Sequence, residues 1–169
     1  MDTSTFLALA LACAPQVHAS TAHALVTIES AFNPWAIGVV GGALQRQPRH
    51  RTEAIATAEA LKGAGRNFSV GLGQINVGNF PRLGLSLSTA FEPCTNLAAM
   101  QTVLMECFER AQRKSARTSD DQAALRDALS CYYSGNFSTG FRHGYVGKLV
   151  AAARNPIRTS PPNPEKEPS

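Results

Sequence analysis

The strongest constraint on the fold is a long amphipathic segment that runs from Cys94 to Lys114. Apolar residues recur along one face at helical spacing, and that face contains a single polar side chain. A helix with so apolar a face buries it in the protein core. We therefore expect a central core helix, whose buried face is formed by Leu97, Gln101, Leu104, Phe108 and Ala111.

Helix signals recur along the rest of the chain, whereas strand signals are scarce. Residues that can cap a helix precede several apolar segments, and glycine or proline follows them. Residues 35–51 are expected to form a loop, and the glycine-rich residues 64–81 a short strand and turn. The fold class is therefore mainly α with at most a small β-hairpin. Helices are predicted over residues 5–12, from Ser20 or Thr21 to Pro34, over 52–63, from Ser119 to Gly135, and over 139–154.

The length of 169 residues fits one domain. Residues 1–154 carry the helical patterns and are expected to form that domain. Residues 155–169 contain five prolines and few apolar side chains, so a disordered tail is predicted there. No apolar run reaches the ~18 residues that a membrane-spanning helix requires, and no membrane span is predicted.

The first twenty residues resemble a secretory signal peptide, with an apolar stretch and a V-H-A sequence before Ser20. Asp2 is acidic, however, and no lysine or arginine precedes Arg46. The positively charged start of a signal peptide is therefore missing. We interpret residues 5–12 as a helix of the folded protein, and expect any export signal to lie outside this chain or to be unconventional.

The net charge of +4 favours an acidic partner, which could be nucleic acid, anionic lipid or a carboxylate-bearing cell-wall polymer. The densest basic run, residues 46–51, contains a proline and no aromatic residue on which bases could stack. A solvated loop explains this run better than a nucleic-acid site does. No nucleic-acid partner is predicted.

The four cysteines, Cys13, Cys94, Cys107 and Cys131, show neither C-x-x-C spacing nor nearby histidines. This pattern does not support a zinc site, and no metal or other cofactor is predicted. One or two disulfides would suit an exported protein, and small buried thiols would suit a reducing compartment. The spacing leaves both alternatives open.

Glu29 is an isolated acid, because no other acid occurs between Asp2 and Glu53. It lies in the apolar stretch LVTIESAFNP, where a carboxylate is costly unless it reaches water, finds a partner or is protonated. In one interpretation helical rotation carries Glu29 to the surface. In the other it lies at the floor of a cleft, where burial raises its pKa and lets it donate a proton near neutral pH.

Three short motifs in order favour the second interpretation. They are ESAFNP (29–34), GLGQIN (71–76) and CYYSGN (131–136). Together they resemble the soluble lytic transglycosylase family, which has a lysozyme-like (goose-type) fold. The sequence around them is similar to the branch of that family associated with type IV secretion and conjugation systems. The resemblance extends over about residues 6–152.

The resemblance implies that Glu29 is catalytic. It would protonate the glycosidic oxygen between N-acetylmuramic acid and N-acetylglucosamine, and then deprotonate the muramyl 6-hydroxyl, which closes to a 1,6-anhydro product. The implied substrate is the glycan strand of peptidoglycan, and the implied compartment is the periplasm, where type IV secretion components could be partners. That compartment would also favour disulfides, and Cys107–Cys131 is the expected pair.

The same resemblance assigns substrate contacts. Gly71 and Gly73 would let the backbone approach a sugar ring, and Gln74 would bind sugar hydroxyls or the N-acetyl group. The hydroxyl of Tyr132 would approach the Glu29 carboxyl and tune its proton affinity. Asn76 and Tyr133 are further candidates for substrate binding. Tyr133 stands where many relatives have asparagine.

The number of acids in the motifs also bears on the mechanism. A conventional glycosidase needs two carboxylates, yet neither GLGQIN nor CYYSGN contains one. A single acid fits substrate assistance by the N-acetyl group, a known exception to the two-carboxylate rule. The sequence departs from the family pattern in two places. Gly38 replaces a usual family serine, for which Ser69 or a backbone N–H could substitute, and residues 43–68 form an insertion, expected to carry a helix over the cleft edge.

Two alternative functions remain open from the sequence. A muramidase would cleave the same bond with water, and a non-catalytic protein of this fold would only bind the cell wall. The glycine at position 38 is the best sequence hint for the latter.

Overall fold

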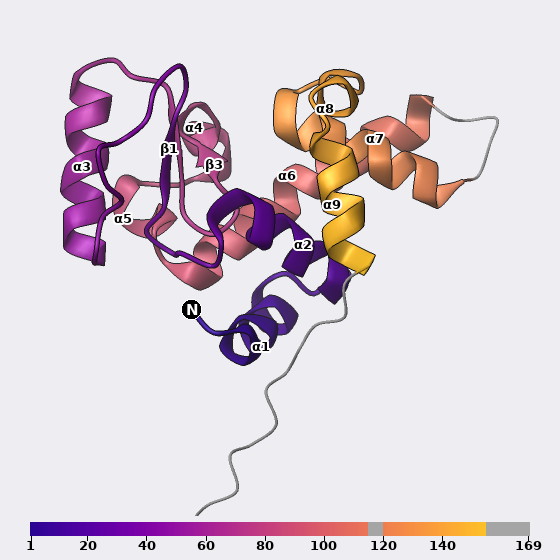
Figure 1. The fold of residues 1–169 in the computed structure, drawn as a ribbon, viewed down its shortest axis with the longest axis horizontal. Helices are drawn as coiled ribbons and strands as arrows, with labels where there is room; N and C mark the ends of the chain where they lie inside the picture. Colours follow the sequence, from indigo (N-terminus) through magenta and orange to yellow (C-terminus); the bar gives the residue numbers. More distant parts are fainter. Residues whose placement is uncertain (115–119, 155–169) are drawn as a thin grey trace, which may run out of the picture.

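A computed structural model describes residues 1–114 and 120–154 of the chain. The described residues are mainly helical, and helix α6 runs through the middle of the molecule (Figure 1). The predicted tail at 155–169 and the predicted cap Ser119 lie outside the described residues. The helices are α1 (Thr3–Cys13), α2 (Ala19–Ser30), α3 (Arg51–Gly63), α4 (Phe80–Leu83), α5 (Leu87–Ala90), α6 (Pro93–Lys114), α7 (Asp121–Ser134), α8 (Thr139–Arg142) and α9 (Tyr145–Arg154), with a 3₁₀ turn η1 at Val77–Asn79.

Helix α6 is the central core helix that its periodicity predicts. Leu97, Leu104 and Ala111 are buried along its inner face, which packs against α1 and α7. Two disulfides reinforce these contacts. Cys13–Cys94 joins the end of α1 to the start of α6. Cys107–Cys131 joins α6 to α7, and this pair is the expected one.

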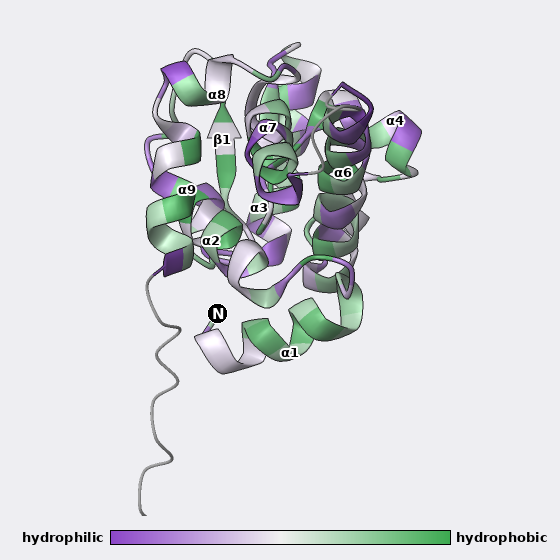
Figure 2. Cartoon of the chain, turned by 90° about the vertical axis from the view of Figure 1, so that its right-hand side faces the viewer, coloured by the Kyte–Doolittle hydropathy of each residue, from purple (hydrophilic) through white to green (hydrophobic). Residues whose placement is uncertain are grey.

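The hydropathy of the helices follows their positions. Helices α6 and α7 show apolar and polar faces, whereas α1 is apolar over most of its length (Figure 2). Phe6 and Ala10 of α1 enter the core, while Leu11 remains 68% exposed. Within the described ranges, no helix is both long and apolar enough to cross a membrane.

The predicted ends of α2 and α3 need correction. Histidine side chains cap both helices in place of the hydroxyl residues expected, because a ring nitrogen of His18 accepts from the backbone N–H of Ser20 and one of His50 accepts from Glu53. Helix α2 also ends at Ser30, before Pro34 can stop it. Its C-cap residue, Ala31, has left-handed backbone dihedral angles (φ 49°).

A small antiparallel sheet lies beside α6. Its strands are β1 (Ile37–Val39), β2 (Phe68–Val70) and β3 (Ile75–Asn76), in the order β1-β2-β3. The hairpin of β2 and β3 agrees with the predicted strand and turn, whereas β1 occupies residues expected to be loop. Gln47 explains how so short an edge strand is held: its carboxamide accepts from the N–H of Ile37 (2.8 Å) and donates to the same residue's carbonyl (2.9 Å).

The C-terminal helical segment is divided in two. Gly135 ends α7, as predicted, and it takes the left-handed conformation (φ 76°). The single helix expected over 139–154 is interrupted after Arg142, because Gly144 also takes a left-handed conformation (φ 72°). The chain therefore changes direction between α8 and α9, and Tyr145 becomes the first residue of α9.

Candidate active site

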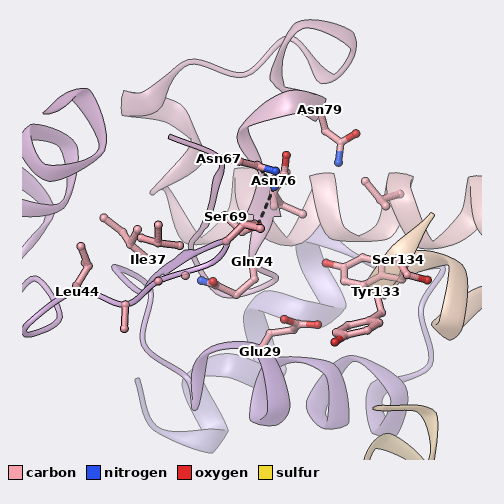
Figure 3. A pocket seen from close by; sticks show the side chains of 18 of the residues that line it. Glu29, Ile37, Leu44, Asn67, Ser69, Gln74, Asn76, Asn79, Tyr133 and Ser134 are labelled. Carbon is pink, nitrogen blue, oxygen red and sulfur yellow. Dashed lines mark hydrogen bonds between the residues drawn. The ribbon is translucent and has the colours of Figure 1, made fainter. Parts of the chain in front are cut away.

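A cleft of about 720 Å³ lies between the sheet, the end of α2 and the end of α7. Glu29 projects into it from α2, Ser69 and Asn76 face it from the strands, and Tyr133 lies across from Gln74 (Figure 3). Among the described residues that line the cleft, Glu29 is the only acid. Glu29 therefore lies in a cleft, as the second interpretation predicts.

Two influences of opposite sign set the proton affinity of Glu29. Burial disfavours the carboxylate and raises its pKa, while a hydrogen bond from Tyr145 favours it and lowers the pKa. Burial is the larger effect, so the pKa of Glu29 rises to about 7. A carboxyl group with this pKa can both donate and accept a proton near neutral pH.

Tyr145 is a residue of the candidate site that sequence reasoning missed. Its hydroxyl donates to Oε1 of Glu29 across 116 residues of sequence. Burial and the neighbouring Glu29 hold the pKa of the Tyr145 hydroxyl well above its usual range, so this group stays protonated and remains a donor. In the sequence, Tyr145 is an aromatic residue on an apolar helix face, and this pattern is typical of core packing.

The predicted contact of the Tyr132 hydroxyl with the Glu29 carboxyl is wrong, because that hydroxyl has another acceptor. The hydroxyl of Tyr132 donates to the carbonyl of Gly73, while the residue still lines the cleft. Burial, and then the charge of Glu29, raise the pKa of Tyr132 well above its usual value. Tyr132 is thus a neighbour of Glu29 that fixes the glycine-rich turn, and Tyr145 takes the role expected of it.

Gly71 and Gly73 are not among the residues that line the cleft. Both are buried against α6. A Cβ atom at Gly71 would lie 2.2 Å from Nδ2 of Asn96, and one at Gly73 would lie 2.9 Å from Cβ of Met100. Close packing of the turn on the helix, rather than the approach of a sugar, therefore accounts for these glycines.

Asn96 anchors this turn to α6 and was also missed. Its Oδ1 accepts from the N–H of Gly73 (2.7 Å), and its Nδ2 donates to the carbonyls of Val70 (3.0 Å) and Ala90 (2.8 Å). The side chain is almost fully buried, at 1% exposure. A single asparagine near the start of an apolar helix carries no sequence signal for such a role.

Gln74 lies in the cleft, as expected, beside Gly38. Its Nε2 donates to the carbonyls of Ala36 (3.1 Å) and Gly71 (3.0 Å). These bonds direct Oε1 toward Gly38, where a Cβ atom would lie only 2.6 Å away. A serine at this position would require the end of the Gln74 side chain to shift.

Ser69 and Asn76 form a polar patch near Gly38. Ser69 pairs directly with Gly38 across β1 and β2, and it also pairs with Asn76 across β2 and β3. Nδ2 of Asn76 donates to Oγ of Ser69 (3.3 Å) and to Oδ1 of Asn67 (2.8 Å). The hydroxyl that could replace the family serine is therefore on the neighbouring strand, facing the same cleft.

Tyr133 forms part of the opposite wall and is 45% exposed. Its ring stacks on Tyr145, with centroids 4.5 Å apart and planes 22° from parallel. Its hydroxyl lies 3.2 Å from Nδ1 of His143. Tyr133 thus covers the tyrosine that contacts Glu29.

The insertion at 43–68 carries a helix, α3, as predicted, but no residue of that helix lines the cleft. The loop before α3 supplies the lining residues Leu44 and Gln47 instead. Within the described parts of the chain, no group of three or more histidine, cysteine, aspartate or glutamate side chains could hold a metal ion.

The helical fold, the small sheet and the glutamate in the cleft define a lysozyme-like domain. The comparison with known families is more specific. The model of the transglycosylase SLT domain matches residues 6–153, and the chain belongs to this family. The resemblance carried by the three motifs is thereby confirmed.

Two relatives extend the comparison. The chain is 48% identical over 153 residues to the type IV secretion system protein virB1 of Brucella abortus, covering 88% of this chain and 63% of the relative. It is 36% identical over 167 residues to protein virB1 of Rhizobium radiobacter, covering 96% of this chain and 67% of the relative. The chain therefore spans less than two thirds of the length of the Brucella protein. No solved structure matches the chain.

Proposed function

We propose that this protein is a peptidoglycan lytic transglycosylase that cleaves the β-1,4 bond between N-acetylmuramic acid and N-acetylglucosamine and forms a 1,6-anhydro end. The observation that carries the proposal is Glu29, the only acid among the described cleft residues, with a pKa of about 7. Hydrolysis by the usual mechanism would require a second carboxylate beside the scissile bond.

The proposed reaction uses Glu29 twice. Its protonated carboxyl gives a proton to the glycosidic oxygen as the bond from that oxygen to C1 of the muramyl sugar breaks. The resulting carboxylate takes the proton of the muramyl 6-hydroxyl as that oxygen bonds to C1. Glu29 ends the cycle protonated, and no water is consumed. The Tyr145 hydroxyl stabilises the carboxylate between these steps through its hydrogen bond.

The polar residues of the sheet have a role in this scheme. The N-acetyl group of the muramyl sugar would stabilise the positive charge that develops at C1. We infer that Ser69, Asn76 and Oε1 of Gln74 orient that sugar, because all three side chains face the cleft near Gly38. Tyr132 and Tyr133 would bound the substrate on the opposite side.

The cellular setting is proposed from the relatives. Two proteins named virB1 match most of this chain, and one of them is named as a type IV secretion system protein. The two disulfides suit an oxidising compartment such as the bacterial periplasm. We infer that the protein opens peptidoglycan locally in the periplasm for a type IV secretion or conjugation apparatus, with components of that apparatus as partners.

Digestion of purified peptidoglycan tests the proposed chemistry. The wild-type protein should release anhydro-muropeptides, which are lighter by one water than the products of a muramidase. Glu29→Gln should lower the rate of release by at least about 100-fold, since general acid–base catalysis contributes that much or more, and should leave cell-wall binding in place. Products with reducing ends would identify a muramidase. Equal behaviour of the two proteins would show that the domain only binds the wall.

A further inference from the structure

A second pocket of about 480 Å³ adjoins the cleft on the side of α6. The two cavities share four lining residues, which are Asn79, Val103, Tyr132 and Gly135. A ligand in the cleft could therefore extend a branch into this side pocket without crossing another part of the protein. Among the residues assigned to catalysis or substrate binding, only Tyr132 lines the side pocket.

The charged residues of the side pocket are Arg82, Glu106 and Arg110, so it carries one excess positive charge. Arg82 is already committed, because its Nη1 donates to both carboxylate oxygens of Glu106 (2.8 and 2.6 Å). Arg110 is different. Among the described residues, no acid lies within 4.0 Å of its guanidinium group.

Several weak contacts nevertheless hold Arg110 in position. Its guanidinium carbon lies 5.5 Å from the centre of the Phe137 ring. Nη1 lies 3.4 Å from Sγ of Cys131, and Nη2 lies 3.5 Å from the carbonyl oxygen of Gly135. The Cys107–Cys131 disulfide also joins α6 to α7 at the wall of the pocket. A positioned guanidinium that has no acid partner among the described residues suits recognition of a carboxylate, whose two oxygens match its planar fork.

We propose that this pocket binds a carboxylate of the peptide stem on the glycan strand that occupies the cleft, with Arg110 as its main ligand. The proposal rests on the proposed function, which places a peptidoglycan strand in the cleft. Peptide stems branch from the muramyl sugars and carry free carboxylates. Arg110 would thereby make the enzyme prefer strands with anionic stems over bare or neutralised glycan.

The test measures binding in the Glu29→Gln background, where strands are not consumed. Two ligands are compared: peptidoglycan strands with intact stems, and the same strands after their stem carboxylates have been converted to amides. Arg110→Gln should weaken binding of the intact strands by about threefold to fivefold, the range expected of a partly exposed ion pair. Binding of the amidated strands should not change. Added salt should reduce the preference for intact strands.

Two further variants sharpen the test. Arg113→Gln removes the same charge one turn along α6, where Arg113 faces Glu109 and does not line the pocket; it should change binding of neither ligand. Glu106→Gln removes the only acid among the described pocket residues. It should strengthen binding of the intact strands, an effect that a merely structural role of the pocket would not produce.

The outcomes separate the two proposals. If the Arg110→Gln protein binds both ligands as its parent does, or loses affinity for both equally, the carboxylate site is refuted while the proposed function stands. An equal loss with Arg113→Gln would also refute it, since net charge alone would then be responsible. If the parent binds neither ligand, the proposed function itself fails.

Discussion

At the scale of single residues, the pKa of Glu29 depends on a contact that the sequence does not reveal. The isolation of Glu29 and the motifs around it were sufficient to predict an acid in a cleft with a pKa near neutrality. The hydroxyl that bonds to it was assigned to Tyr132, because that tyrosine lies in a motif. The actual donor, Tyr145, is placed by the break between α8 and α9 at Gly144, and the periodicity of residues 139–154 indicated one continuous helix.

Replacement of Tyr145 by phenylalanine should raise the pKa of Glu29 above about 7. The hydrogen bond favours the ionised carboxyl, so its removal leaves burial less opposed, and a shift of about one unit is expected for a bond of this kind. The general acid then stays protonated to higher pH. The alkaline limb of kcat/KM against pH should therefore move upward while kcat falls. An unmoved limb, in a variant with unchanged thermal stability, would show that Glu29 is not the group that titrates there.

At the scale of elements, the central helix and the helix order follow directly from apolar periodicity, but the connection between α6 and the sheet does not. Periodicity reports which face of an element is buried, whereas Asn96 joins α6 to Val70 and Gly73 through hydrogen bonds that span 26 and 23 residues. The glycines of the turn were similarly assigned to substrate contact, since a sequence does not show what a Cβ atom would meet. Strand β1 was missed because the side chain that supports it, Gln47, belongs to a loop.

Replacement of Asn96 by alanine should lower the free energy of unfolding by about 2–4 kcal/mol, because it leaves buried backbone groups of the turn and sheet without partners. Thr102→Ala on the same helix is the control. Its hydroxyl is exposed and bonds only to the carbonyl of Ala98, so its effect should be within about 0.5 kcal/mol. Urea unfolding followed by circular dichroism measures both. Equal effects would mean that the Asn96 hydrogen bonds do not anchor the turn.

At the scale of the whole molecule, each of the two disulfides attaches a different helix to α6. Cys13–Cys94 closes a segment of 81 residues and attaches α1, whose apolar surface includes the exposed Leu11. Cys107–Cys131 closes only 24 residues between helices that already pack closely. The sequence predicted the shorter pair from the neighbouring helices and the implied compartment. It left the longer pair open, because its partners meet only in the assembled fold.

The longer bridge should therefore contribute more to stability. Loop closure in the unfolded chain gives about 4.5 kcal/mol for a segment the length of Cys13–Cys94 and about 3.5 kcal/mol for one the length of Cys107–Cys131. Replacing both cysteines of one bridge by alanine, and then both of the other, allows the two losses to be compared by urea unfolding. The Cys13–Cys94 variant should unfold at the lower urea concentration. The reverse order would mean that the packing of α6 on α7 depends on its disulfide more than chain entropy accounts for, and that the wall shared by the cleft and the side pocket is held mainly by that bond.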